Sequence, residues 1–275
     1  MTYRAFYGLT HNPFEKGIAC ERIYESLDYK QFSARMDYFK KVKGFALVYG
    51  EPGSGKTTSI RAFTSKLNPQ LYRVVYLPLS TVTVLDFYRH MALGLGLKPC
   101  FRKVDLFHQI QEYIANANYQ KNLCPLIVID EAQFIHNGVL NDLRLIFNFQ
   151  MDSKNYAMVL LSGQVSFLNQ LSLHVNEPLR QRITISYGFR GLSKDETESY
   201  LLSLLKSAGV TEPLFAADAV EAIFAFSNGL PRLINLLAEK SLLVGYQKQL
   251  KAVNSEIVQL AREDLDFLSP MPLGN

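Results

Sequence analysis

The chain has 275 residues, enough for one large domain or two modest ones, and its 48% hydrophobic and 20% charged content excludes wholesale disorder. A formal net charge of +4 permits a polyanionic partner without requiring one. The three cysteines show no C-x-x-C spacing, which argues against a disulfide framework or a zinc site, and no apolar run reaches the roughly 18 residues of a membrane helix. We therefore predict a cytoplasmic protein without a membrane segment.

The chain opens with a segment that we predict to be an irregular leader, residues 1–33. Pro13 interrupts any helix in this segment. Three apolar side chains, Tyr7, Leu9 and Phe14, are expected to anchor the leader in a core.

A glycine-rich loop follows residues 45–49, a short apolar run typical of a buried strand. Its residues match the pattern G-x-x-x-x-G-K-[ST] and are Gly50, Glu51, Pro52, Gly53, Ser54, Gly55, Lys56 and Thr57. In this pattern the glycines let backbone N–H groups face a phosphate, the lysine supplies a cation, and the final hydroxyl is a ligand for Mg²⁺. Thr58 continues into a helix, predicted for residues 58–67, whose positive end faces the same phosphates. The alternative is a glycine-rich turn with an incidental lysine.

Strands are expected to alternate with helices as far as residue 188. After the strand at 45–49, strands are predicted at residues 73–77, 126–129, 157–161 and 183–187. Helices are predicted at residues 31–43, 58–67, 84–95 and 104–117. This alternation indicates an α/β fold, an αβα sandwich around a five-stranded parallel sheet, which we assign to residues 34–188 as a nucleotide-hydrolysing core.

Only helical periodicity remains beyond residue 189, and residues 189–268 are predicted to form a helical lid. Ser193 and Glu196 are spaced as a capping box, Gly209 ends that helix, Pro231 opens a later one, and Asn254 is a cap for the last. Residues 269–275 are predicted to be a disordered tail.

Two acids, Asp130 and Glu131, close the predicted strand at 126–129. Carboxyl ends of parallel strands share one edge of a sheet, so Asp130 would lie beside the phosphate loop, where it could hold Mg²⁺. Glu131 could then activate the attacking water. Ser162 and Gln164 end the next strand and are candidates to contact the γ-phosphate or that water. The alternative interpretation is a set of ordinary polar residues at strand ends.

Three arginines are candidates for stabilising phosphate charge. Arg180 and Arg182 precede the last strand, where a guanidinium presented to a neighbouring subunit would stabilise transition-state charge. Arg232 opens a helix of the predicted lid and could reach the nucleotide from there. Solvated surface arginines are the alternative, and the sequence does not choose between Arg180 and Arg182.

Together, residues 50–57, 130–133, 162–164 and 229–235 resemble AAA+ ATPases of the secretion-protein-A (ExeA/GspA) type, and residues 7–14 resemble that family's opening signature. The same branch includes transposition ATPases similar to TniB, TnsC and MuB. The resemblance implies an AAA+ core with a helical lid, ATP and Mg²⁺ as cofactors, and a homo-oligomer. That oligomer would be a ring, expected to be hexameric, or a helical filament with nucleotide between subunits.

The resemblance also assigns a role to each matching residue. Those roles are phosphate binding by Lys56, Mg²⁺ binding by Thr57 and the Walker B acid Asp130, catalysis by Glu131, sensor one at Ser162 or Gln164, the arginine finger at Arg182 or Arg180, and sensor two at Arg232.

Two branches of the family compete for the function. Secretion members carry a membrane segment and a peptidoglycan-binding region, whereas transposition members resemble this chain in being short, so we favour the second branch. We expect an ATPase that assembles on duplex DNA with ATP and recruits or activates a transposase, with hydrolysis controlling assembly and release. A secretion-pathway ATPase lacking the membrane segment is the alternative, and a nucleotide-gated scaffold and a helicase are more distant ones.

A DNA-contacting surface is expected in the connection at residues 94–103, which is rich in helix breakers. Arg102 and Lys103 lie there and could touch phosphates from the inner surface of a ring, with Lys121 as a further candidate. Solvated loop charges are the alternative.

Overall fold

The computed structural model describes residues 2–15, 23–78, 83–150 and 153–266. The chain divides into two compact units. The sheet unit comprises Tyr29–Pro52 and Lys56–Phe189, and the helical unit comprises Met1–Asp28, Gly53–Gly55 and Arg190–Asn275. The predicted tail at residues 269–275 lies outside the described residues, as does part of the leader, residues 16–22.

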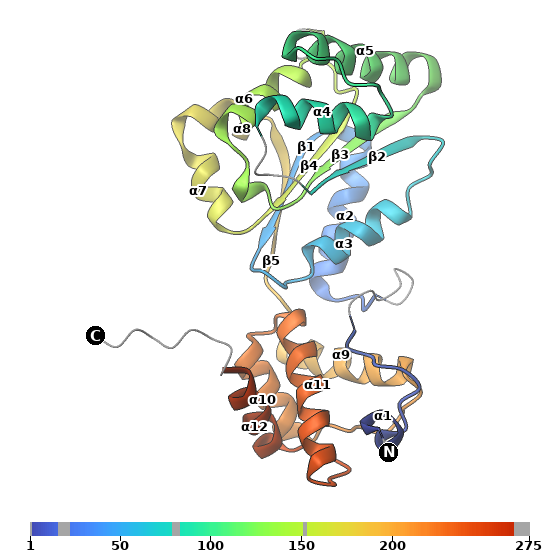
Figure 1. The fold of residues 1–275 in the computed structure, drawn as a ribbon, viewed down its shortest axis with the longest axis vertical. Helices are drawn as coiled ribbons and strands as arrows, with labels where there is room; N and C mark the ends of the chain where they lie inside the picture. Colours follow the sequence, from blue (N-terminus) through green and yellow to red (C-terminus); the bar gives the residue numbers. More distant parts are fainter. Residues whose placement is uncertain (1, 16–22, 79–82, 151–152, 267–275) are drawn as a thin grey trace, which may run out of the picture. The chain divides into compact units, whose positions relative to one another are not determined.

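The sheet unit is built on a five-stranded sheet with the order β2-β3-β4-β1-β5, all of whose pairs are parallel (Figure 1). The strands are β1 (Gly44–Gly50), β2 (Tyr72–Leu77), β3 (Cys124–Ile129), β4 (Met158–Gly163) and β5 (Ile183–Phe189). Every residue of β3 and β4 is buried, because helices cover both faces of the sheet. The predicted five-stranded parallel sheet is confirmed.

Helices cover the two faces unequally. One face packs against α2 (Leu27–Val42) and α3 (Lys56–Ser65), whose Phe32 and Phe63 belong to the same buried cluster as Val48 of β1. The other face is covered by α4 (Val84–Leu95), α5 (Lys103–Lys121), α6 (Asn137–Ile146), α7 (Ser166–Ser172) and α8 (Glu177–Arg180), with short turns η2 (Ala132–Phe134) and η3 (His174–Asn176) between them. Burial on both faces is what holds the strand ends at one edge in fixed positions.

Helix α4 shows how the local sequence sets these boundaries. Its N-terminus is capped by the Thr83 hydroxyl, which accepts a hydrogen bond from the Asp86 N–H at 3.2 Å. Its C-terminus is closed by Gly96, whose φ of 85° suits a residue without a side chain. Between the caps, Phe87 and Met91 lie on one buried face, one turn apart. The predicted range, residues 84–95, agrees with the observed helix.

The helical unit contains α1 (Tyr3–Tyr7), α9 (Lys194–Ser207), α10 (Ala217–Ser227), α11 (Pro231–Gln247) and α12 (Ser255–Asp266). The capping box at Ser193 is present, with the Glu196 N–H donating to the Ser193 hydroxyl at 3.2 Å and the Ser193 N–H donating to Glu196 at 3.1 Å. Asn254 caps α12 by accepting a hydrogen bond from the Ile257 N–H at 3.1 Å. Among the described residues, no helix combines the length and apolar character needed to span a membrane.

The prediction of an irregular leader is wrong at both ends of that segment. Residues Tyr3–Tyr7 form α1, which begins after Thr2 and ends at Gly8 with a φ of 74°. The helix is short, but the Tyr7 hydroxyl donates to the Leu250 carbonyl at 2.9 Å, and this tertiary contact stabilises a turn that would be marginal alone. Helix α2 begins at Leu27 rather than at residue 31.

Candidate active site at the carboxyl edge of the sheet

The strand order explains why three distant stretches of sequence meet. Strand β4 lies between β1 and β3, with Val48 opposite Ser162 and Ile129 opposite Leu161. Asp130, one residue beyond Ile129, therefore lies level with Ser162. The loop after β1 emerges at the same edge, which is where parallel α/β sheets place their ligands.

The Asp130 carboxylate is the centre of the site. It is 4% exposed and accepts hydrogen bonds at both oxygens. Oδ2 accepts from the Thr57 hydroxyl and from the Tyr76 hydroxyl, each at 3.0 Å. Oδ1 accepts from the Ser162 hydroxyl at 2.7 Å and from the Glu131 N–H at 3.0 Å. A buried carboxylate needs such donors, and these come from α3, from β2 and β4, and from the backbone just after β3, so the charge sits at a fixed point between strand ends.

Tyr76 was not predicted as a site residue. Burial, and after it the Asp130 carboxylate, raise the pKa of Tyr76 to about 12. The phenol is therefore a hydrogen-bond donor to Asp130 at neutral pH. The sequence carried no motif that would single out this tyrosine, because its role depends on β2 lying next to β3.

The phosphate loop has the features that an anion requires. Lys56 is only 8% exposed, and its ammonium donates to the Gly50 carbonyl at 2.8 Å and to the Glu51 carbonyl at 2.9 Å. Gly55 has a φ of 95°, a conformation that favours glycine. The Ser54 hydroxyl is buried without a hydrogen-bond partner among the described residues, so it is free to donate to a phosphate oxygen.

The donor set also fits Mg²⁺. Thr57 and Asp130 offer a hydroxyl and a carboxylate oxygen 3.0 Å apart. In the described part of the chain no group of three or more His, Cys, Asp or Glu residues gathers to hold a metal. Mg²⁺ suits such a sparse site, because it keeps much of its water and takes phosphate oxygens as further ligands.

The Glu131 carboxylate lies beside this centre on an unusual backbone. Glu131 is exposed and has φ 52° and ψ 41°, a left-handed conformation that is uncommon for residues other than glycine and that is enriched at functional sites. Its Oε2 accepts a hydrogen bond from Gln133 Nε2 at 2.6 Å. Gln133 Oε1 in turn accepts from the backbone N–H of Gln164 at 3.0 Å. Gln133 belongs to the quoted stretch 130–133 but was not predicted as a site residue.

The remaining nucleotide candidates are placed as follows. Glu51 and Pro52 are exposed in the loop, and Thr58 is half-buried in the first turn of α3. Arg180 is exposed and pairs with Glu177 at 3.6 Å, whereas Arg182 is half-buried and donates to the Arg144 carbonyl. Arg180 is therefore the more accessible of the two finger candidates. Arg232 is exposed in the first turn of α11 in the helical unit, and its role as sensor two stays a prediction.

The structure does not gather the three predicted DNA contacts. Arg102 directly precedes α5, is 80% exposed, and forms a two-pronged ion pair with Asp105 at 2.8 and 3.0 Å. The Lys103 ammonium pairs with the buried Asp142 carboxylate at 2.6 Å. Lys121 is the last residue of α5, about 27 Å along the helix axis from Lys103 at 1.5 Å per residue.

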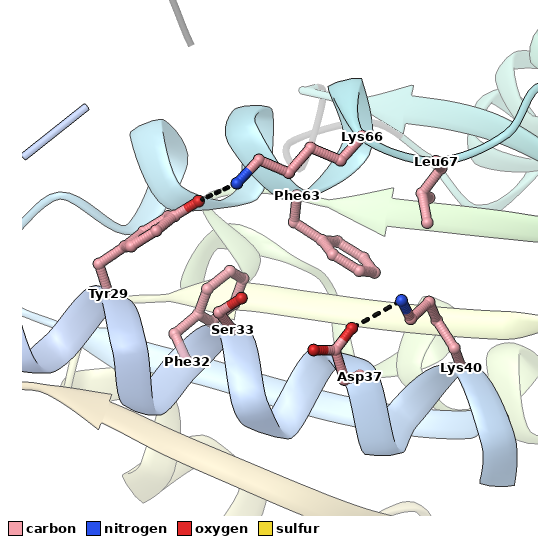
Figure 2. A pocket seen from close by; sticks show the side chains of 8 residues that line it. All are labelled: Tyr29, Phe32, Ser33, Asp37, Lys40, Phe63, Lys66 and Leu67. Carbon is pink, nitrogen blue, oxygen red and sulfur yellow. Dashed lines mark hydrogen bonds and ion pairs between the residues drawn. The ribbon is translucent and has the colours of Figure 1, made fainter. Parts of the chain in front are cut away.

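A separate hollow of about 260 Å³ lies between α2 and α3 (Figure 2). Its lining residues are Tyr29, Phe32, Ser33, Asp37, Lys40, Phe63, Lys66 and Leu67. Figure 2 shows the Lys66 ammonium bonded to the Tyr29 hydroxyl, at 3.0 Å, and Lys40 paired with Asp37, at 2.6 Å. None of these residues belongs to the phosphate loop or to the strand ends around Asp130.

The chain resembles known proteins both in sequence and in fold. A family model described as an AAA domain matches residues 40–171. General secretion pathway protein A of Aeromonas hydrophila is 30% identical over 266 residues, which cover 95% of this chain and 48% of that protein. The chain thus spans about half the length of that relative.

A second sequence relative and one solved structure also match the chain. The ATP-dependent target DNA activator B of Escherichia phage Mu is 26% identical over 149 residues, 54% of this chain and 44% of that protein. The crystal structure of Cdc6p from Pyrobaculum aerophilum superposes with a TM-score of 0.69 at 16% identity, covering 95% of this chain and 74% of that one. At that identity the superposition shows the shared fold.

Proposed function

We propose that the chain is an AAA+ P-loop NTPase and that the carboxyl edge of its sheet binds ATP with Mg²⁺ and hydrolyses it to ADP and phosphate. The support is the AAA domain model that matches residues 40–171 and the 30% identity that covers 95% of the chain. The observation that carries this proposal is the hydrogen bond from the Thr57 hydroxyl to the buried Asp130 carboxylate at 3.0 Å. It joins the phosphate loop to the acidic strand end, so both motifs serve one site.

Each residue then has a chemical task. Lys56 exchanges its loop carbonyls for the β- and γ-phosphate oxygens. Thr57 and Asp130 would hold Mg²⁺, which would neutralise phosphate charge when bound. Glu131 orients a water and takes its proton as the water oxygen bonds to the γ-phosphorus and the bond to the β-γ bridging oxygen breaks. The released proton and phosphate pass to solvent.

We propose further that ATP lets the chain assemble on duplex DNA as a ring or filament and so regulate a transposase. The support is the similarity to a protein described as an ATP-dependent target DNA activator, together with a net charge of +4. A role in a secretion pathway is the second candidate, and it is favoured by the 30% identity that covers 95% of the chain.

Electron microscopy with duplex DNA separates the two candidates. We expect ordered assemblies on DNA with a non-hydrolysable ATP analogue and none with ADP. Assembly that depends on the analogue but ignores DNA would contradict the DNA-binding role and support the second candidate. Affinity should be measured over a salt series, because phosphate contacts make binding fall steeply with salt.

The Arg102→Ala variant should bind DNA more weakly in the presence of ATP, with the salt slope of binding reduced by about 1. Arg102 suits this test because its guanidinium is 80% exposed and its partner Asp105 is a surface acid. Lys103 does not, because removing it would leave the buried Asp142 carboxylate without its cation and would lower stability.

Lys40→Ala is the matched control for Arg102→Ala. Lys40 also forms an ion pair with an acid three residues away, Asp37, but lies on α2. If the salt slope of DNA binding is the same for Arg102→Ala, for Lys40→Ala and for the unchanged chain, Arg102 does not contact DNA.

A further inference from the structure

The side chain of Gln133 occupies a distinctive position at the site, between the Glu131 carboxylate and the end of β4. Its amide is held at both ends, with Nε2 donating to Glu131 Oε2 at 2.6 Å and Oε1 accepting from the Gln164 N–H at 3.0 Å. An amide donates at one end and accepts at the other without carrying charge, and glutamine is the longer of the two amide side chains.

The backbone around Gln133 is shaped for this contact. A Cβ added to Gly163 would lie 3.1 Å from Gln133 Oε1 and 3.3 Å from the Cβ of Phe167, so a side chain there would crowd the amide. On the other side, Glu131 adopts φ 52°, which turns the chain into η2 and brings Gln133 back toward β4. The missing side chain at Gly163 and the left-handed backbone at Glu131 therefore both favour the bridge that Gln133 forms between Glu131 and Gln164.

Besides the bond between Gln133 and Gln164, the segment after Glu131 is hydrogen-bonded to α7. Gln170 Nε2 on α7 donates to the Ile135 carbonyl at 2.7 Å and to Asn137 Oδ1 at 3.1 Å. Residues 133–137 are thus bonded at one end to Gln164, just after β4, and at the other end to Gln170 on α7. A shift of residues 163–170 would be transmitted to the Glu131 carboxylate through Gln133.

We propose that Gln133 is the positioning residue of Glu131, and that it couples the direction of this carboxylate to the end of β4, where the Ser162 hydroxyl donates to Asp130. The proposal rests on the proposed ATPase function. In this proposal Gln133 contacts neither nucleotide nor water. It affects the rate of hydrolysis by holding Glu131, which contacts the water.

Two isosteric variants separate the two ends of the amide. Gln133→Met removes both hydrogen bonds, whereas Gln133→Glu keeps an acceptor for the Gln164 N–H and loses the donor to Glu131. We expect both variants to lower kcat by about 10- to 100-fold, as misplaced catalytic groups do, while KM for ATP stays within about 3-fold. Wild-type kcat in Gln133→Glu would overturn the proposal, because it would place the whole role of the amide in the bond to β4.

A double-mutant cycle distinguishes positioning from general loosening. If Gln133 acts through Glu131, adding Gln133→Met to the Glu131→Gln variant should change the residual single-turnover rate by less than about 2-fold. Full additivity of the two losses would overturn the proposal. Gln111→Met is the matched control, since this half-buried glutamine donates to the Ile146 carbonyl at 3.1 Å at the end of α6, and it should leave kcat unchanged.

Failure of this proposal differs from failure of the proposed function. If the unchanged chain does not hydrolyse ATP with Mg²⁺, both ideas are wrong. If the unchanged chain is active and Gln133→Met turns over at the same rate with the same thermal unfolding midpoint, only the role of Gln133 is wrong.

Discussion

The Lys56→Ala variant should lose nucleotide binding, with affinity for ATP and ADP reduced by about 100-fold or more. Lys56 is only 8% exposed, and its ammonium is expected to contact both the β- and γ-phosphates. Hydrogen bonds to charged groups contribute about 1.5–3 kcal/mol each, so the loss of two amounts to about 3 kcal/mol or more. Isothermal titration with ATP and ADP in the presence of Mg²⁺ measures the effect directly.

Lys66→Ala is the control for this variant. Lys66 also has a hydrogen-bonded ammonium, on Tyr29 in the hollow of Figure 2, but it follows Lys56 by ten residues, about 15 Å at helical rise. It should bind nucleotide as the unchanged chain does. Equal affinities for Lys56→Ala and Lys66→Ala would mean that the loop does not hold phosphate, and the assignment of the site would fail.

The strands of the sheet could be predicted from sequence because each is marked by the pattern of its own residues. Strands β3 and β4 are short unbroken apolar runs, which buried parallel strands require, and the predicted ranges lie within two residues of those observed. The predicted range of helix α4 agrees with the observed one, and in the structure Thr83 and Gly96 set its ends by local chemistry. The phosphate loop and Asp130 were identifiable because their spacing is itself the motif.

The rest of the site depends on strand order, which the sequence does not display. The Tyr76 bond to Asp130 spans 54 residues and needs β2 beside β3, and the bond from the Gln164 N–H to Gln133 spans 31 residues and needs β3 beside β4. Helices α6, α7 and α8 were not predicted; α7 and α8 have only seven and four residues and flank the 3-10 turn η3, and α6 follows the 3-10 turn η2. Helix α1 was missed for a similar reason, since five residues carry little periodicity and the Tyr7 contact is tertiary.

The Glu131→Gln variant should bind ATP with nearly unchanged affinity and hydrolyse it about 10²- to 10⁴-fold more slowly. The substitution keeps the size of the side chain, and its carbonyl oxygen can still accept the Gln133 hydrogen bond, but the amide cannot take a proton from water. Single-turnover hydrolysis of radiolabelled ATP measures the rate, and titration with ATP measures the affinity. Glu112→Gln on α5, an exposed glutamate, is the control and should turn over normally.

The two variants fail at different steps, and this difference tests the proposed link between hydrolysis and DNA. Lys56→Ala should form no ATP-dependent assemblies on DNA, because it lacks the nucleotide. Glu131→Gln should form them with ATP itself, without an analogue, and should retain them long after the unchanged chain has released DNA. Normal turnover in Glu131→Gln would show that the Glu131 carboxylate takes no part in ATP hydrolysis. Slow turnover with normal release would instead show that release does not depend on hydrolysis.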